Sequence, residues 1–321
     1  MWTGGLAILL CGAATADGRS AARPGEAPKI LEDLAARLKE KLAQALPRTE
    51  KDVVYGEAHG QKLKLDIYFP AGHDPATSPR RPGIVAVHGG GWRGGDKKDM
   101  GLVALPLVLD GYVVFSVSYR LFGGGERARN IYPAQLDDCQ RAVRWVRAHA
   151  VEYGVDPNHL GAIGASAGGH LVALLGTCDT RDNSDAALAK YSSRVQAVVD
   201  IFGPTDLTRD FSHLRFGLGT VQKLVDDFLG PGGKPNARDA SPLFHIDQTT
   251  VPFLIIHGDK DPIVPVEQSR DFHAALQKAG RDSTYVELQN EGHGLGQRGS
   301  LAKLLSSTKA FFAKHLRGVS P

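Results

Sequence analysis

The chain has 321 residues, of which 42% are hydrophobic and 23% are charged, so it is long enough to bury a sizeable core in one large α/β domain or two small ones. The net charge is +3, and Lys and Arg are dispersed without a basic run, which argues against a nucleic acid partner. No break in composition divides the chain, and we therefore expect one large domain.

An apolar run near the amino terminus, residues 6–11, is followed by Ala14, Thr15 and Ala16. The run is far shorter than the ~20 apolar residues of a membrane-spanning helix, so we expect no membrane span. The run and the A-x-A pattern resemble the apolar core and cleavage site of a secretory signal, although no Lys or Arg precedes them. We expect residues 1–20 to be a signal peptide and the protein to be secreted or periplasmic; a disordered start is the alternative.

The next stretch, residues 21–50, is predicted to be a linker followed by an amphipathic helix. Apolar residues recur at helical spacing over residues 30–46. The pattern then changes to strands, with an apolar segment at 53–55 and strict alternation at 63–69. We expect these two segments to form antiparallel edge strands.

Short apolar runs then alternate with stretches of helical periodicity. The runs predict strands at residues 84–88, 112–118, 160–164, 195–202, 253–257 and 284–288, and helices are expected at 135–153, 167–175, 267–279 and 300–316. Such alternation is typical of βαβ units. We expect an α/β fold over residues 51–318, with a mostly parallel sheet of about eight strands, helices on both faces and a small cap insertion at about 207–248. Three arginines of the first of these helices are expected to face solvent: Arg141, Arg144 and Arg147.

Ser166 stands where an apolar run ends and a helical pattern begins. Gly164 and Gly168, two residues before and after it, allow a strand and a helix to approach closely at a sharp turn. The hydroxyl would lie at the tip of this turn, above the unpaired amides of the helix. Because glycine is frequent in this chain, the G-x-S-x-G pattern alone is weak evidence for a nucleophile, and the interpretation depends on partners elsewhere.

The loop after the strand at 84–88 reads His-Gly-Gly-Gly-Trp from His88 to Trp92. Three successive glycines leave the backbone amides unobstructed, which favours an anion site such as an oxyanion hole. A phosphate site is the alternative, but the G-K-[ST] sequence that opens the helix of a phosphate-binding loop is missing.

Two further loops carry an acid and a histidine. Asp259 and Asp261 follow one predicted strand, and His293 follows the next. Parallel sheets bind ligands at the carboxyl ends of their strands, so these loops and the serine turn are expected to meet. A histidine in a surface loop is the alternative for His293 alone, but the chain order serine, acid, histidine predicts a catalytic triad of Ser166, an acid of this loop and His293. Asp261 is favoured as the acid because Pro262 restricts it to an extended geometry that suits a side chain projecting toward His293. Asp259 is expected to cap the amides of its own turn.

These motifs resemble those of α/β-hydrolase-fold serine esterases of the HGGGW type, which are related to the hormone-sensitive-lipase-like carboxylesterases. The pattern is most similar to the acetylxylan and feruloyl esterase-like group. The resemblance covers about residues 53–316 and rests on five motifs: HGGGW with GDK at 88–97, YPAQ-x-x-D at 132–138, G-x-SAGGH at 164–170, GPTDL at 203–207 and HG-x-x-D-x-x-VP at 257–265.

The resemblance implies acyl transfer through a covalent acyl-enzyme, with no metal and no organic cofactor. Ser166 would attack the ester carbonyl, His293 would carry the proton, and Asp261 would orient the imidazole. The oxyanion would be bound by three backbone amides, those of Gly90, Gly91 and Ala167.

The substrate implied by the resemblance is a short acyl ester, either a small molecule or one linked to a xylan-type polysaccharide. Trp92 is expected to form a wall of the acyl or alcohol pocket, or to pack over its own loop. Four further polar residues are interpreted as structural supports: His88, Asp138, His170 and Asp206.

Two other functions stay open. One is amide hydrolysis of the arylformamidase kind, since such loops also occur there, and the other is a non-catalytic binding module of the same fold. Neither Cys139 nor Cys178 has metal-ligand spacing, and we interpret both as packing residues, with a disulfide between them neither predicted nor excluded. The sequence makes no prediction about the oligomeric state.

Overall fold

The computed structural model describes residues 46–123, 129–294, 296 and 298–318. The chain divides into two units, Met1–Ala43 and Gln44–Pro321, and all described residues belong to the second. The predicted signal peptide and nearly all of the predicted linker and helix lie outside the described residues.

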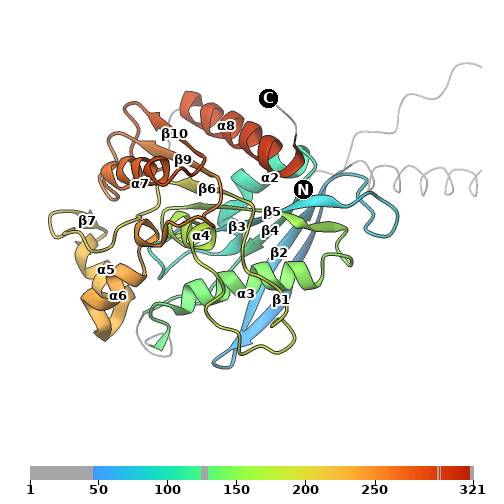
Figure 1. The fold of residues 1–321 in the computed structure, drawn as a ribbon, viewed down its shortest axis with the longest axis horizontal. Coiled ribbons are helices and arrows are strands. Elements are labelled where there is room, and N and C mark those ends of the chain that lie inside the picture. Colours follow the sequence, from blue (N-terminus) through green and yellow to red (C-terminus); the bar gives the residue numbers. More distant parts are fainter. Residues whose placement is uncertain (1–45, 124–128, 295, 297, 319–321) are drawn as a thin grey trace, which may run out of the picture. The chain divides into compact units, whose positions relative to one another are not determined.

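An eight-stranded sheet forms the centre of the second unit (Figure 1). In spatial order its strands are β1 (Arg48–Ala58), β2 (Gln61–Phe69), β4 (Val113–Val117), β3 (Arg81–Val87), β5 (Val155–Ala165), β6 (Ala197–Ile201), β9 (Phe253–Gly258) and β10 (Ser283–Leu288). The pairs β1·β2 and β2·β4 are antiparallel, and every other neighbouring pair is parallel. The predicted mostly parallel sheet of about eight strands is therefore confirmed.

The first two strands differ in detail from the prediction. β1 begins at Arg48, three residues before the expected domain boundary at 51, because Arg48 pairs with Phe69 of β2 and its guanidinium lies over that ring, 3.6 Å from the centroid. Of these two strands only β1 lies at an edge of the sheet, since β2 lies between β1 and β4.

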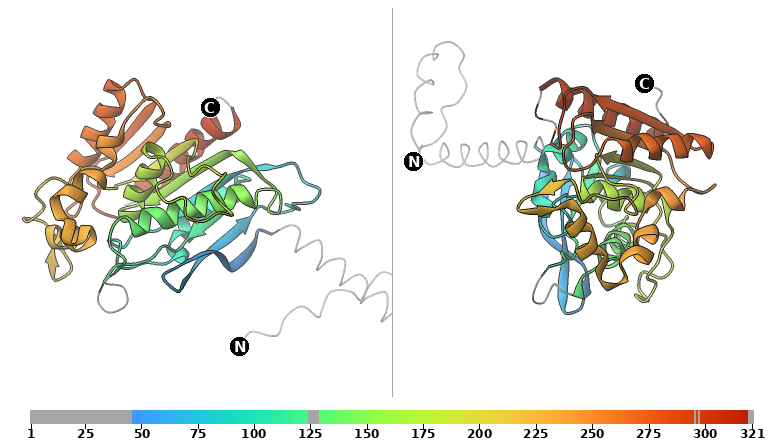
Figure 2. Two further views of the ribbon diagram at one scale, coloured as in Figure 1. Left: turned by 60° about the horizontal axis from the view of Figure 1, so that its bottom comes forward. Right: turned by 90° about the vertical axis from the view of Figure 1, so that its left-hand side faces the viewer.

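Helices cover both faces of the sheet, as expected. One face carries α2 (Gly101–Leu109) and α8 (Arg298–Arg317), and the other carries α3 (Ala134–Ala148), α4 (Ala167–Thr177) and α7 (Glu267–Lys278). The green helix α3 and the red helix α8 lie on opposite sides of the sheet in Figures 1 and 2. In β3, Ile84 and Ala86 pack toward α2 and α8, while Val85 and Val87 pack toward the other helices. Alternation along the strand thus supplies two separate cores.

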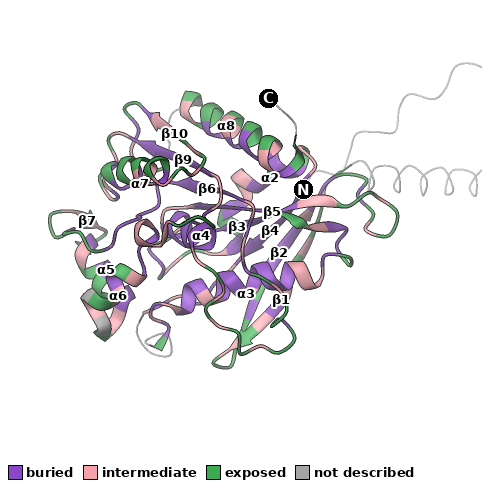
Figure 3. Ribbon diagram, viewed as in Figure 1, coloured by how far each residue is buried: buried purple, intermediate pink, exposed green. Residues whose placement is uncertain are grey.

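Strands β4, β6 and β9 are buried over their whole length, and burial falls off on the outer sides of the helices (Figure 3). Helix α2 does not have a polar outer side, because Leu102, Leu105 and Leu109 are exposed there. Its inner residues Leu107 and Val108 are buried. Apolar residues on both sides leave no amphipathic pattern, which is why the sequence does not predict this helix. None of the helices in the described part of the chain combines the length and apolar character needed to cross a bilayer.

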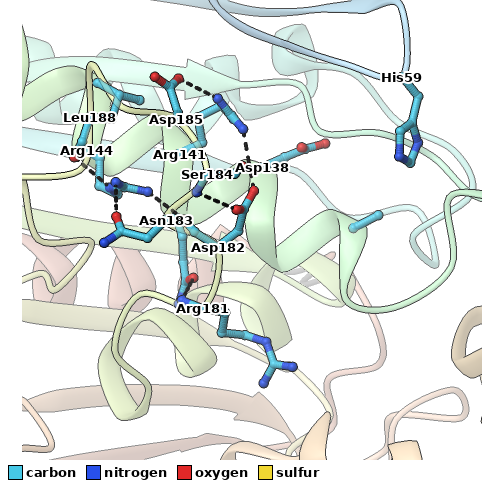
Figure 4. A network of polar contacts seen from close by, with 12 residues as sticks. His59, Asp138, Arg141, Arg144, Arg181, Asp182, Asn183, Ser184, Asp185 and Leu188 are labelled. Atoms are coloured by element: carbon cyan, nitrogen blue, oxygen red, sulfur yellow. Dashed lines mark hydrogen bonds and ion pairs between the residues drawn. The ribbon is translucent and has the colours of Figure 1, made fainter.

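The expectation that three arginines of α3 face solvent is wrong. The segment 179–194 folds over the outer side of the helix, where Arg144 is only 2% exposed and donates hydrogen bonds to three backbone carbonyls of the segment (Figure 4). Arg141 pairs with Asp185 at 2.6 Å, and Arg147 donates to two further carbonyls of the same segment. The carbonyls satisfy the guanidinium groups, so charged side chains are buried under an irregular segment.

The segment between β6 and β9, which includes the predicted cap at 207–248, forms a small layer of its own at the orange end of Figure 1. It contains a two-stranded hairpin, β7 (Arg215–Phe216) and β8 (Gly219–Thr220), and the helices α5 (Val221–Leu229) and α6 (Gly233–Asp239). Short 3-10 helices lie at Gly230–Gly232 and Pro242–His245 in this segment and at Lys97–Met100 before α2. The inner side of α5 is apolar and buried, so this layer packs onto the body of the unit.

Candidate active site

The turn at Ser166 joins the end of β5 to the start of α4, as predicted. Ser166 has φ 55° and ψ −121°, a conformation that side-chain-bearing residues rarely adopt. A Cβ at Gly164 would lie 2.3 Å from the carbonyl oxygen of Gly168, and a Cβ at Gly168 would lie 2.1 Å from that of Val87. The strand and the helix therefore approach so closely that both positions require glycine.

Ser166, His293 and Asp261 are joined by hydrogen bonds. Ser166 Oγ lies 2.9 Å from His293 Nε2, and His293 Nδ1 lies 2.7 Å from Asp261 Oδ2. They stand on the loops after β5, β10 and β9, and β9 and β10 are parallel neighbours whose ends lie side by side. Because a carboxylate only accepts, Nδ1–H donates to Asp261, which leaves Nε2 free to accept from the serine hydroxyl.

The side chain of Asp261 is buried, and its carboxylate accepts four hydrogen bonds. Its Oδ1 accepts from the backbone amides of Ile263 and Val264, and its Oδ2 accepts from His293 and from His257. Burial acts to raise the pKa of this carboxyl, but the hydrogen bonds from His257 and His293 outweigh it and hold the pKa well below the usual range. Asp261 is thus an anion at any pH near neutrality.

Asp259 has a different role from the one expected. Its Oδ1 accepts the backbone amide of Asn290 at 2.6 Å and so ties the loop after β9 to the loop after β10. The amides of its own turn are capped by Asp261 instead. The prediction that Asp259 caps the amides of its own turn is therefore wrong. Its carboxylate binds an amide of the neighbouring loop instead, because the parallel pairing of β9 and β10 brings that loop within reach.

The glycine loop passes directly beside the serine. A Cβ on Gly89 would lie 3.3 Å from the Cβ of Ser166. Gly90 and Gly91 have φ of 105° and 57°, and a Cβ at Gly91 would meet Leu224 of α5 at 2.9 Å. The amide of Ala167 is the first of α4 and has no acceptor within its own helix. Of the three expected oxyanion residues, Gly91 and Ala167 line the same pocket as Ser166, and Gly90 precedes Gly91 in the glycine loop.

Trp92 is buried and stacks on Phe228 of α5, with ring centroids 4.2 Å apart. Its Nε1 donates to Nδ1 of His170, and Nε2 of His170 donates to the carbonyl of Ala240. Burial lowers the pKa of His170 to about 4, so this ring is neutral and can accept from the indole. Trp92 also belongs to the lining of the adjacent pocket.

A pocket opens next to Ser166, with about 420 Å³ of space including its open mouth. Apart from the serine hydroxyl, its lining side chains are apolar or absent, and many belong to the layer between β6 and β9. The lining residues are Gly91, Trp92, Ser166, Ala167, Pro204, Leu207, Phe211, Phe216, Val221, Leu224, Val225, Ile263 and Val264. Such a lining accommodates an apolar group and offers no partner to a charged one.

Of the four residues interpreted as supports, His170 holds Trp92 of the pocket lining, and the other three make contacts outside that lining. Asp138 forms a buried ion pair with Arg120 at 2.8 Å, and His88 stacks on Tyr119 with centroids 4.3 Å apart. Asp206 accepts hydrogen bonds from the backbone amide and the hydroxyl of Thr208.

The two described cysteines carry free thiols: Cys139, buried in the core, and Cys178, half-buried at the end of α4. Among the described residues, no three His, Cys, Asp or Glu side chains come together as metal ligands.

One polar residue of the site was not singled out from the sequence. His257, at the end of β9, contacts the same oxygen of Asp261 as His293 does. The only signal is its place in the motif HG-x-x-D, four residues before Asp261. Nothing in that spacing indicates that both imidazoles would reach one carboxylate oxygen.

A comparison with known families matches residues 65–276 to BD-FAE. The chain belongs to the BD-FAE family. It is 31% identical over 253 residues to the probable carboxylic ester hydrolase LipM of Mycobacterium tuberculosis, an alignment that covers 78% of this chain and 57% of LipM. The chain thus spans somewhat more than half the length of the curated relatives it matches.

Solved esterase structures have the same fold. Esterase 2 of Thermogutta terrifontis superposes with a TM-score of 0.69 at 30% identity, covering 83% of this chain and 94% of that one. A truncated carbohydrate esterase from gut microbiota superposes with a TM-score of 0.70 at 26% identity, covering 84% and 96%. The α/β-hydrolase fold of this BD-FAE member and its resemblance to esterases, both predicted from the motifs, are confirmed.

Proposed function

We propose that this BD-FAE member is a serine carboxylic-ester hydrolase in which Ser166 is the nucleophile, His293 the general base and Asp261 the orienting acid. The proposal is carried by one observation, the unbroken line of hydrogen bonds from Ser166 Oγ through His293 to Asp261, at 2.9 and 2.7 Å. The esterase names of its relatives support the same activity.

The mechanism follows from the donors and acceptors. His293 Nε2 accepts the proton of Ser166 as Oγ attacks the ester carbonyl carbon, and the carbonyl oxygen becomes an oxyanion bound by the amides of Gly90, Gly91 and Ala167. When the intermediate collapses, the imidazolium returns the proton to the leaving alcohol and an acyl-enzyme remains. Water then attacks the acyl carbon as His293 takes its proton, and the imidazolium returns that proton to Ser166 Oγ when the bond between Oγ and the acyl carbon breaks and the carboxylic acid leaves.

The acyl group is proposed to be short and uncharged. The apolar pocket beside Ser166 supports this assignment, as do structures of Thermogutta terrifontis Est2 with propionate and with butyrate bound. A carbohydrate-linked ester, acetyl or feruloyl, is the proposed natural substrate, on the strength of the motif resemblance and of the carbohydrate esterase among the similar structures. An activity panel of acetylated xylan, methyl ferulate and nitrophenyl esters tests it, and N-formylkynurenine tests the amide alternative.

Replacement of the serine tests the activity itself. Ser166→Ala removes the nucleophile, and we expect kcat to fall by about 10⁴ to 10⁶-fold with the fold intact. The matched control is Ser283→Ala, because Ser283 Oγ also pairs with a histidine, Nδ1 of His273, at 2.8 Å but away from the pocket.

We expect Ser283→Ala to keep wild-type turnover and wild-type stoichiometric labelling by paraoxon, while Ser166→Ala loses both. A Ser166→Ala protein with a tenth of wild-type turnover would refute the assignment. A wild-type protein that neither turns over esters nor takes up the label would be a non-catalytic module.

A further inference from the structure

We propose that His257 is a positioning residue for the triad, holding the oxygen of Asp261 to which His293 donates. This inference rests on the proposed function. His257 is fully buried at the end of β9, with Nε2 3.1 Å from Asp261 Oδ2 and 3.0 Å from the carbonyl oxygen of Val264, and with Nδ1 2.7 Å from Ser269 Oγ. One imidazole thus bridges the loop of the triad acid and helix α7.

The partners determine which nitrogen carries the hydrogen. The carbonyl of Val264 can only accept, so Nε2 must be a donor, and its N–H is shared between that carbonyl and Asp261 Oδ2. Nδ1 then accepts the hydroxyl proton of Ser269, which satisfies the ring as the neutral Nε2–H tautomer. His257 is therefore a fixed donor to the carboxylate.

Two imidazoles donate to the same oxygen, Asp261 Oδ2. The N–H of His257 has two effects there. It fixes the position of the oxygen, and with it the direction of the His293 ring toward Ser166. It also takes part of the negative charge, so the carboxylate stabilises the His293 imidazolium less than it would with one donor fewer.

Three further side chains lie around His257, and none of them links it to Ser166 through hydrogen bonds. Asp200 of β6 lies near it, Phe202 packs against both imidazoles, and Glu287 of β10 is its register partner. The carboxylate of Glu287 is held by Arg270, at 2.9 Å, on the exposed side of α7. Asp261 is therefore the group through which a change at His257 reaches the reacting atoms.

Two substitutions distinguish the effect of the N–H that His257 donates to Asp261 from the effect of the volume of its ring. His257→Gln can place an amide N–H where Nε2 stands, while His257→Asn can keep a polar atom facing Ser269 but offers no donor to Asp261. For His257→Asn we expect kcat to fall about 10- to 100-fold with little change in KM. We also expect the acid limb of the kcat/KM profile to move to higher pH. His257→Gln restores the wild-type limb and part of kcat.

The control is His273→Asn, which makes the same change in an α7 histidine whose Nδ1 also pairs with a serine, Ser283, but which is not bonded to the triad; we expect it to leave the pH profile unchanged. An unshifted acid limb in His257→Asn, or the same profile in the Asn and Gln variants, overturns the inference. If instead Ser166→Ala stays active, the proposed function itself fails, so the two failures are distinguishable.

A measurement on the wild-type protein tests the inference even if the His257 variants do not fold. Ring ¹⁵N chemical shifts of His257, assigned through the backbone, report its tautomer directly. We expect the single ring proton of the neutral imidazole to lie on Nε2. A neutral ring that carries its proton on Nδ1 overturns the inference.

Discussion

At the scale of single residues, Asp259 and Asp261 lie two positions apart and do different things. Asp261→Asn puts an amide where two imidazole N–H groups converge, so it favours the wrong tautomer of His293 and clashes with the donor of His257. We expect kcat to fall on the order of 10⁴-fold, as for the corresponding change in a serine protease, and the melting temperature to fall as well. Steady-state kinetics well below the melting temperature separate the two effects.

Asp259→Asn is the matched comparison. Its amide oxygen can still accept the backbone N–H of Asn290, so we expect measurable turnover and at most a modest loss of stability. The assignment of the triad acid is reversed if Asp259→Asn is well folded and inactive while Asp261→Asn turns over substrate.

The buried carboxyl group of Asp200, near the site, is expected to make the stability of the folded state depend on pH. Asp200 is fully buried, Oδ1 accepts the amide of Gly203, and Oδ2 has no hydrogen-bond partner among the described groups. Burial raises the pKa of Asp200 to about 6. Because the folded-state pKa exceeds the unfolded value, the folded state binds the proton more tightly, and this contribution to stability is lost as the pH rises from about 4 through 6.

The variant Asp200→Asn removes that titration and keeps an oxygen for Gly203. Thermal melts from pH 4.5 to 8 should show the variant gaining stability relative to the wild type as the pH rises through 6. A difference in melting temperature that is independent of pH would contradict the assignment.

At the scale of elements, helix α5 closes the pocket beside the serine with Val221, Leu224 and Val225. We expect kcat/KM to favour acetyl and propionyl esters over octanoyl and longer ones, because a methylene that fits contributes up to about 0.8 kcal/mol and one that does not fit contributes nothing. Leu224→Ala enlarges the pocket and should move the preference toward longer chains. Nitrophenyl esters from acetyl to decanoyl measure both.

The control is Leu218→Ala, since Leu218 lies in the β7–β8 turn of the same layer and is fully exposed. It should leave the chain-length profile unchanged. A wild-type profile that rises from acetyl to decanoyl would indicate a deep lipase-like channel instead.

At the scale of the whole molecule, the prediction of export stands apart from the fold. If residues 1–20 act as a signal peptide, expression in a Gram-negative host with the native start should give periplasmic protein that lacks this segment, as measured by mass spectrometry of fractionated cells. Ile8→Arg, which places a charge in the apolar run, should leave full-length protein in the cytoplasm. If the wild-type protein and the Ile8→Arg variant are divided equally between periplasm and cytoplasm, the prediction of a signal peptide is wrong.

Local sequence determined most of the framework and the identity of the candidate site residues. Each buried parallel strand is a short apolar run, and the turn at Ser166 requires glycine at fixed positions on both sides, so a window of a few residues contains the needed information. The loops that carry the proposed triad were predicted for the same reason, because each follows directly on such a strand and the carboxyl ends of parallel strands meet at one edge.

Only the tertiary structure decided which partners those residues take. The burial of Arg144 depends on a segment some 40 positions away in the chain, as the separation of their hydrogen-bonded residues shows, and helical periodicity carries no record of it. Asp259 reaches Asn290 and His257 shares Asp261 with His293 because β9 and β10 are parallel neighbours. The apolar pocket forms where α5 packs over the glycine loop. Such contacts depend on the relative placement of whole elements, whereas propensity and periodicity act within each one.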